Sequence, residues 1–208
     1  MEGLNHIHKQ KIIHRDFHSK NILCENEYDV IISDLGISKL STELSVNDNK
    51  CYGMIPYIAP EIFQGQKYEK YTKASDIYSF GMIMWEIMAG RRPFWNFQDS
   101  DTDLIIQICD GFRPPIITNA PKGYIELMQN CWNFNPNKRP NIDEIWELID
   151  EIILNEENNP TKIIISPDIG PIIENKLYSS TIILPEFTGC LKSSKIIDED
   201  NCNANINN

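Results

Sequence analysis

The feature that most constrains this chain is a pair of polar motifs, separated along the sequence by two short β-branched runs. The run HRDFHSKN extends from His14 to Asn21, and the triplet Asp34-Leu35-Gly36 begins thirteen positions after Asn21. Between them, the β-branched runs Ile22–Cys24 and Val30–Ser33 flank a polar, turn-like segment. Because β-branched residues favour strands, the sequence predicts a small hairpin that links the two polar motifs.

Four periodic stretches elsewhere predict helices, so the expected fold class is mainly α. In residues 74–90, apolar side chains recur at helical spacing and also spill around the opposite face, which predicts a central buried helix ended by Gly90. Amphipathic helices are expected over Asp101–Cys109, Lys122–Trp132 and Ile142–Leu154, the first with its own first residue as the N-cap.

The periodic pattern stops near Asn155, which predicts a domain over residues 1–154 and a tail over residues 155–208. The tail contains Asn-rich and Ser-rich pieces, with only short apolar runs such as Ile163–Ile165 and Thr181–Leu184. Low-complexity polar segments bury too little apolar surface to fold alone, so we expect the tail to be flexible.

Composition excludes several classes of partner. The 208 residues are 41% apolar and 24% charged, as in a soluble globular domain, and their net charge of -11 argues against nucleic acid. No stretch approaches the roughly 18 apolar residues of a membrane span and no secretory leader is recognisable, so a cytoplasmic location is expected. The six cysteines form no CxxC pair, which indicates reduced thiols.

The motifs resemble those of eukaryotic protein kinases. The triplet His14-Arg15-Asp16, with Asn21, is similar to the catalytic loop of that family, while Asp34-Leu35-Gly36 and Ala59-Pro60-Glu61 are similar to the two ends of its activation segment. The resemblance extends from about Leu4 to Leu154. It implies the helical C-terminal lobe of the bilobal kinase fold, with the small hairpin beside the catalytic loop.

The resemblance implies phosphoryl transfer from MgATP to hydroxyl groups of a protein substrate. Taken alone, Asp16 is a solvated loop carboxylate, but in this family it aligns the acceptor hydroxyl and receives its proton. Asn21 and Asp34, alone ordinary turn formers, would supply oxygen ligands to Mg²⁺. Lys20 would place a cation near the γ-phosphate, as in some tyrosine kinases, whereas many serine/threonine kinases have a lysine where this chain has His18.

Several further positions match family residues with structural or regulatory roles. Glu61 is expected to form a buried ion pair with Arg139, and Asp76 to bind the catalytic-loop backbone or, alternatively, to act as an N-cap. Arg15 is similar to the arginine that binds a phosphate on the activation segment. The hydroxyl-bearing residues available for that modification are Ser38, Ser41, Thr42, Ser45 and Tyr52.

Three apolar or aromatic positions are expected in the core. His14 and Leu35 resemble members of the apolar stack between the two kinase lobes, and Leu23 resembles the floor beneath the adenine ring. Gly36 completes the triplet that opens the activation segment.

The details favour the tyrosine-kinase-like group. Tyr57 in YIAPE resembles serine/threonine and tyrosine-kinase-like proteins, whereas DIYSFGMIMWE, starting at Asp76, resembles the tyrosine and tyrosine-kinase-like groups. Met54 stands where serine/threonine kinases usually have a threonine whose hydroxyl bonds the catalytic aspartate. We therefore expect serine/threonine or dual specificity and a reduced activity.

The printed sequence contains no GxGxxG loop and no VAIK lysine, and Met1 falls within the helix that should lead into the catalytic loop. We therefore expect the chain as printed to bind MgATP weakly and to transfer no phosphate by itself. One interpretation is the catalytic half of a kinase whose N-terminal lobe lies upstream. Another is a truncated module that binds or scaffolds a full-length kinase, and a third is an unrelated helical interaction protein. Intact Asp16, Asn21 and Asp34 favour the first.

Overall fold

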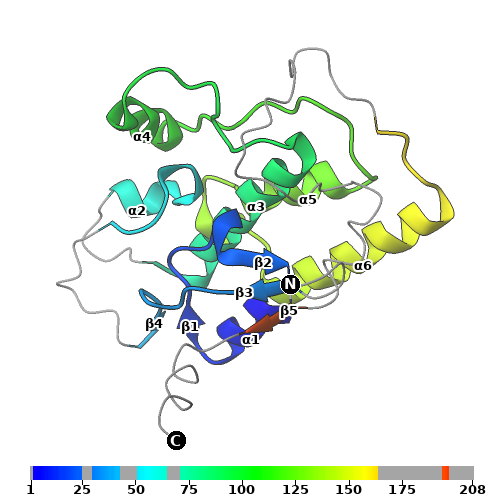
Figure 1. The fold of residues 1–208 in the computed structure, drawn as a ribbon, viewed down its shortest axis with the longest axis horizontal. Helices are drawn as coiled ribbons and strands as arrows, with labels where there is room; N and C mark the ends of the chain where they lie inside the picture. The colour runs from blue at the N-terminus through cyan, green and yellow to red at the C-terminus, as the bar shows by residue number, and fades with distance from the viewer. Residues whose placement is uncertain (1, 25–29, 43–50, 65–70, 164–193, 197–208) are drawn as a thin grey trace, which may run out of the picture.

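The computed structural model describes residues 2–24, 30–42, 51–64, 71–163 and 194–196. Figure 1 shows a mostly helical body with small sheets at one side, and the mainly α fold expected from the sequence is confirmed. The helices are α1 (Glu2–Lys9), α2 (Pro60–Gln64), α3 (Lys73–Ala89), α4 (Asp101–Cys109), α5 (Tyr124–Cys131) and α6 (Ile142–Asn158). Three short 3₁₀ helices are η1 (Ser19–Asn21), η2 (Ile55–Tyr57) and η3 (Pro136–Lys138).

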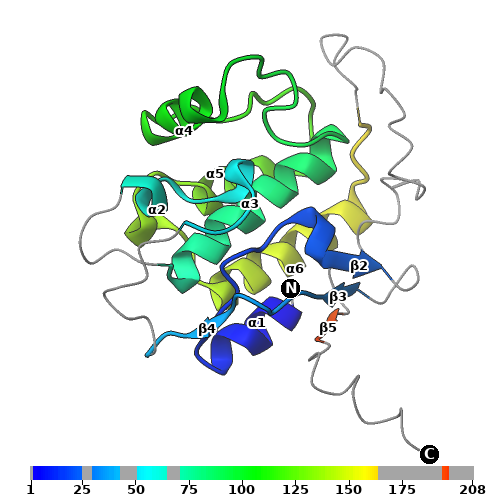
Figure 2. The ribbon, with the colours of Figure 1, turned by 60° about the vertical axis from the view of Figure 1, so that its left-hand side comes forward.

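Helix α3 forms the centre of the core. Every residue from Ser75 to Glu86 is buried, as predicted from the apolar side chains on both faces of the helix. Thr72 and Ser75 cap the first turn reciprocally, and Gly90 ends the helix with a φ of 65°. In Figure 2, α3 runs between α2 and α4 on one side and α1 and α6 on the other.

Helix α5 packs closely against α3 because Gly81 leaves room for it. A Cβ atom at Gly81 would lie 2.9 Å from the Cβ of Cys131 and 3.1 Å from the carbonyl oxygen of Met128. The Tyr124 hydroxyl also donates a hydrogen bond of 2.9 Å to the carbonyl of Met84. These contacts fix α5 against the central helix.

The predicted hairpin is present, and its turn lies outside the described residues. Strand β2 (Ile22–Cys24) pairs antiparallel with β3 (Val30–Ile32), which also pairs in parallel with β5 (Ser194–Ile196). A second sheet joins β1 (Ile12–Ile13) to β4 (Lys39–Leu40). Because these strands border residues 14–21 and 33–38, the two sheets hold those segments side by side.

Several helix ends differ from the sequence predictions, and α5 for example begins at Tyr124 rather than Lys122. The N-cap of α4 is Ser100 rather than Asp101, because Ser100 Oγ accepts from the Asp103 amide while the Asp103 carboxylate accepts from the Ser100 amide. Helix α6 runs to Asn158, past the predicted end at residue 154. Most of the expected tail, residues 164–193 and 197–208, lies outside the described residues, and none of the described helices could span a lipid bilayer.

Candidate active site

Residues 14–21 are fixed to the core through the carboxylate of Asp76, in the first turn of α3. Asp76 accepts hydrogen bonds of 2.9 Å from the backbone amide of His14 and 3.1 Å from that of Arg15. The buried ring of His8, on α1, also lies 2.9 Å from this carboxylate. Because Thr72 caps α3, Asp76 is not the N-cap, and its contacts are those of the other alternative, a bond to the loop backbone.

The ring of His14 is fully buried and held as the neutral tautomer with a proton on Nε2. The backbone amide of Asp16 donates to His14 Nδ1 at 3.3 Å, which requires a lone pair on that nitrogen. Nε2 lies 3.2 Å from the Ser33 carbonyl oxygen, which can only accept. Burial lowers the pKa of His14, in agreement with a neutral ring.

Arg15 has a strained backbone and a side chain enclosed by aromatic rings. Its φ is 73°, a value that non-glycine residues adopt rarely and mostly at functional sites. The guanidinium lies 5.0 Å from the ring centroid of Tyr52 and 4.8 Å from that of Tyr71, and Nη1 donates to the Ile37 carbonyl at 3.2 Å. The Tyr71 hydroxyl also bonds the Tyr52 backbone, so this cluster ties the segment around residue 52 to the loop.

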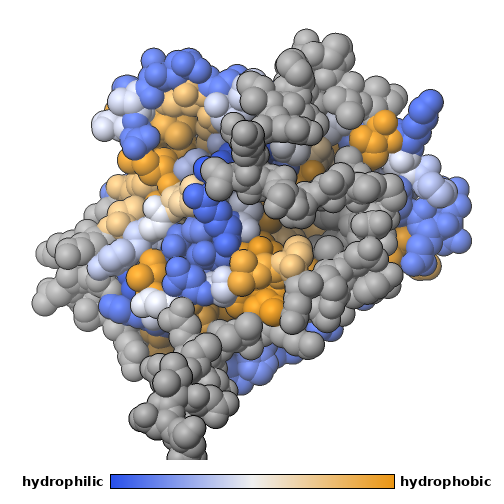
Figure 3. All heavy atoms as spheres, in the orientation of Figure 1, coloured by the Kyte–Doolittle hydropathy of each residue, from blue (hydrophilic) through white to orange (hydrophobic). Residues whose placement is uncertain are grey.

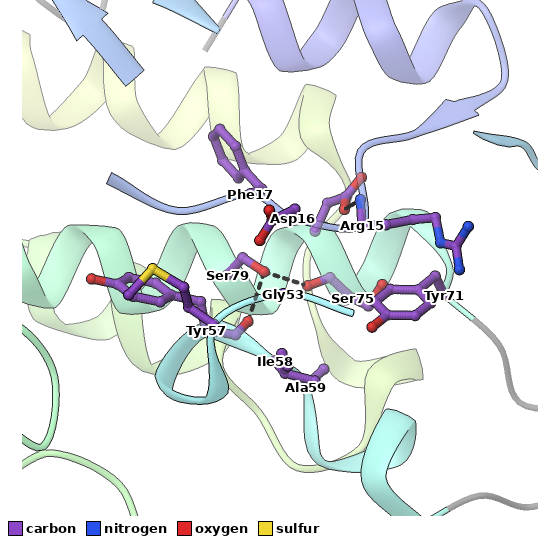
Figure 4. Close-up of a pocket in the computed structure, with 12 residues that line it drawn as sticks. Arg15, Asp16, Phe17, Gly53, Tyr57, Ile58, Ala59, Tyr71, Ser75 and Ser79 are labelled. Carbon is purple, nitrogen blue, oxygen red and sulfur yellow. Dashed lines mark hydrogen bonds between the residues drawn. The ribbon is translucent and has the colours of Figure 1, made fainter. Parts of the chain in front are cut away.

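Asp16 lines a small pocket between residues 15–17, residues 53–59 and the start of α3 (Figure 4). Gly53 has a φ of 105° and passes so close that a Cβ atom there would lie 3.1 Å from Asp16 Oδ1. Nε2 of His18 lies 3.3 Å from the same oxygen. The His18 ring lowers the pKa of Asp16 below its ordinary value despite the opposing effect of burial, so this carboxyl group is ionised at neutral pH.

Asn21 and Asp34 stand at the same end of the hairpin. The Ser33 amide donates to the Asn21 carbonyl at 2.8 Å, while Asn21 Nδ2 donates to the Asp16 carbonyl at 2.9 Å and leaves its amide oxygen to accept. Asp34 is exposed, with a φ of 61°, and Oδ1 accepts from the Gly36 amide at 3.3 Å. An amide oxygen and a carboxylate suit Mg²⁺, which usually takes its other ligands from water and phosphate. The described residues contain no cluster of three His, Cys, Asp or Glu side chains suited to a metal.

Leu23 is not a core residue, contrary to the sequence prediction. Its side chain is 48% exposed because little of the described chain covers that face of β2. Figure 3 shows apolar side chains gathered over β2 and β3. Leu35 is half-buried against the core, and His14 is fully buried.

Glu61 and Arg139 form the buried ion pair expected from the sequence. Arg139 Nη1 and Nη2 donate to the two carboxylate oxygens of Glu61 at 2.6 and 2.7 Å. Arg139 also donates to the carbonyls of Ala74, at 2.9 Å, and Asn133, at 2.8 Å. The pair therefore fixes α2 to the start of α3 and to η3.

These features agree with a comparison of the sequence with protein families. A family described as protein tyrosine and serine/threonine kinase matches residues 1–149. The chain belongs to this kinase family.

Individual relatives cover much of the chain. A probable serine/threonine-protein kinase of Dictyostelium discoideum is 36% identical over 151 residues, which is 73% of this chain and 16% of the relative. A putative serine/threonine-protein kinase/receptor of Acanthamoeba polyphaga mimivirus is 36% identical over 69% of this chain and 8% of its own length. Ephrin type-A receptor 7 of Gallus gallus is 31% identical over 89% of this chain and 18% of its own length. The kinase chain therefore spans less than a fifth of each of these proteins.

Two contacts of the kinase site were not predicted from the sequence. One is the approach of His18 to the Asp16 carboxylate, although the replacement of a family lysine at position 18 was a visible signal. The other is a hydrogen bond of 2.5 Å from the Tyr57 hydroxyl to the buried Glu86. The side chain of Lys20, the cation expected near the γ-phosphate, is exposed on η1.

Proposed function

We propose that this chain is the C-terminal, catalytic lobe of a protein kinase of the tyrosine-kinase-like group. The observation that carries the proposal is the placement of Asp16, Asn21 and Asp34 by hydrogen bonds around one end of the hairpin. Phosphoryl transfer asks a protein mainly to position the reactants and to neutralise charge. One carboxylate for the acceptor and two oxygen ligands for Mg²⁺ meet those needs.

In the proposed reaction, Asp16 aligns the acceptor hydroxyl of a protein substrate and takes its proton as the hydroxyl oxygen bonds to the γ-phosphorus of ATP. The bond from that phosphorus to the bridging oxygen breaks, and ADP leaves with the electron pair. The lowered pKa of Asp16 keeps the acceptor of the proton ionised at neutral pH. Mg²⁺ supplies charge neutralisation on the phosphates. Asn21 and Asp34 would hold it, and Lys20 would add a cation near the γ-phosphate.

ATP also needs a surface for its base and a second lobe for its phosphates. The exposed Leu23 would lie beneath the adenine ring, while Leu35 and His14 would join the two lobes. The printed sequence has no glycine-rich loop, so we propose that an upstream segment or a partner kinase supplies that lobe. Residues 1–154 would form the catalytic domain and residues 155–208 a flexible tail. Because ATP is the donor, the proposed compartment is the cytoplasm.

We propose serine and threonine, or dual specificity, for the acceptor hydroxyl. Two of the relatives above carry serine/threonine kinase names, and Tyr57 agrees with that group. The matching family, described as protein tyrosine and serine/threonine kinase, keeps tyrosine among the candidate acceptors.

A second candidate function is a module without catalysis that binds or scaffolds a full-length kinase. It is favoured by the exposed Leu23 and the apolar side chains over β2 and β3, a surface that a partner could cover. The two functions can be separated with a joined enzyme, in which the ATP-binding lobe of a related tyrosine-kinase-like protein is fused before residue 1. We expect the joined enzyme to phosphorylate a mixed Ser/Thr/Tyr peptide library. If it binds MgATP but phosphorylates no peptide, the scaffold function is the correct one.

A further inference from the structure

We propose that His18 is a positioning residue for Asp16, and that it holds the buried carboxylate oxygen so that the rest of the group can meet the acceptor hydroxyl. The inference rests on the proposed kinase function and adds a residue to the same site.

The first support is the burial of the contact between the two side chains. Nε2 of His18 lies 3.3 Å from Asp16 Oδ1, and the two side chains are 7% and 20% exposed. Asp16 Oδ1 itself is buried, so the remaining exposure of the Asp16 side chain belongs to its other atoms. His18 and Gly53 therefore approach the buried Oδ1 of Asp16, while another part of the Asp16 side chain faces the solvent.

The second support is a pair of unsatisfied polar atoms. Although Nε2 is near, neither Asp16 Oδ1 nor His18 Nδ1 has a regular hydrogen bond within the described part of the chain. Buried polar atoms without partners destabilise a fold, so each one requires an explanation. Catalytic hydrogen bonds are often long in the absence of substrate and shorten when substrate binds. A contact that closes only in the substrate complex explains the loose geometry.

The third support comes from position 54. The sequence predicts that Met54 deprives Asp16 of a hydroxyl partner, and the Met54 side chain indeed offers no donor. The side-chain nitrogen that faces this carboxylate is instead Nε2 of His18, 3.3 Å from Oδ1. We therefore assign to His18 the place that a threonine hydroxyl would otherwise take.

The His18 ring is itself well supported. It lies 5.9 Å from the ring of Tyr57, whose hydroxyl donates to Glu86 and lies 3.4 Å from Ser19 Oγ. The His18 carbonyl accepts a hydrogen bond of 3.0 Å from the Asn21 amide. The titratable groups around His18 are Asp16, Tyr57, His14 and, through Tyr57, Glu86.

The first arm of the test uses the joined enzyme with His18→Ala. We expect kcat to fall at least about tenfold with the KM for MgATP unchanged, because nucleotide contacts remain while the carboxylate loses its orientation. The acid limb of the pH profile should move to higher pH, since the pKa of Asp16 rises without the ring. His18→Gln keeps an N–H donor and should restore part of kcat. His6→Ala, which removes an exposed histidine on α1, is the matched control.

The second arm uses the 208-residue chain and needs no activity. Carboxyl ¹³C NMR should show the titration of Asp16 at higher pH in His18→Ala than in the parent or in His6→Ala. Thermal unfolding checks that each variant is folded, and if His18→Ala does not fold, the comparison is made with His18→Gln and His18→Leu. An unchanged kcat, acid limb and titration would overturn the role of His18. If the parent joined enzyme transfers no phosphate, the kinase function fails, whereas the NMR arm still decides whether His18 acts on Asp16.

Discussion

At the scale of single residues, the proposed chemistry depends most on one carboxylate. Asp16→Asn keeps the size of the side chain but removes the proton acceptor. We expect turnover of the joined enzyme to fall by about 10²- to 10⁴-fold, with the fold retained and the affinity for MgATP nearly unchanged. Steady-state assays measure the turnover, and calorimetry measures the affinity for MgATP. A variant that kept more than about a tenth of the turnover would contradict the role of Asp16 in general base catalysis.

The same carboxyl group predicts a dependence of stability on pH. The pKa of Asp16 in the folded chain is lowered from 3.8, so the fold favours the ionised form. This contribution is fully present above the pKa of the unfolded chain and is lost as pH falls through the folded pKa. The stability advantage of the parent chain over Asp16→Asn should therefore shrink between about pH 5 and pH 2. Melting temperatures across that range test it, and a constant difference would contradict it.

The sequence predicted which candidate residues lie near one another, but not what surrounds them. Asp16, Asn21 and Asp34 could be grouped because their spacing along the chain is fixed, and their roles stay predictions. The approach of His18 to Asp16 depends on the path of residues 53–59, which close the pocket from a distant part of the chain. The burial of Leu23 was predicted wrongly for a related reason. A strand pattern does not show whether another element covers a side chain.

At the scale of elements, the ion pair of Arg139 and Glu61 makes α2 part of the helical core. Arg139→Met would leave the buried Glu61 carboxylate without its bidentate partner and would remove the hydrogen bonds from residue 139 to the carbonyls of Ala74 and Asn133. Removing one member of a buried pair costs about 3 to 5 kcal/mol. We expect a loss of that size in the free energy of unfolding measured with urea.

Lys138→Met is the matched control, because Lys138 is the preceding residue and is exposed. We expect it to change the unfolding free energy by less than about 0.5 kcal/mol. Equal losses for the two variants would show that the ion pair has no special role.

Elements with strong local patterns were the predictable ones. Helix α3 and its end at Gly90 follow from the sequence, because apolar periodicity and a left-handed cap are local signals. Strands β1 and β4 contain two residues each, and their paired residues are at least 26 positions apart in the sequence. No local sequence pattern therefore predicts them. The N-cap of α4 was predicted at Asp101 instead of Ser100, because aspartate and serine are both good N-caps. Only the reciprocal hydrogen bonds between Ser100 and Asp103 decide between them.

At the scale of the whole molecule, a rigid helical body presents a small polar site at its edge. Helix α3 is buried along nearly its full length and anchors the loop through Asp76, while the hairpin brings Asn21 and Asp34 together. The apolar surface over β2 and β3 in Figure 3 lies beside this site. Binding of a second lobe there would cover the surface and complete the nucleotide site in a single step.

The last prediction follows from this arrangement and concerns MgATP. Among the described residues, the contacts proposed above for MgATP are the exposed Leu23 for the base, and Asn21 and Asp34 for the metal. Because Mg²⁺ keeps much of its water and takes only one or two protein ligands, these contacts cannot orient a triphosphate. We expect a dissociation constant of about 1 mM for the 208-residue chain and one at least about tenfold lower for the joined enzyme.

Isothermal calorimetry on both proteins measures the difference, and Asp34→Asn in the joined enzyme serves as the comparison. This variant removes one of the two proposed metal ligands and should lower the affinity for MgATP. The affinity for metal-free ATP should stay nearly unchanged, because the proposed contact of Asp34 with the phosphates runs through the cation. Low micromolar binding of MgATP by the 208-residue chain would mean that its own residues orient the phosphates. The second lobe would then be needed for the substrate rather than for the nucleotide.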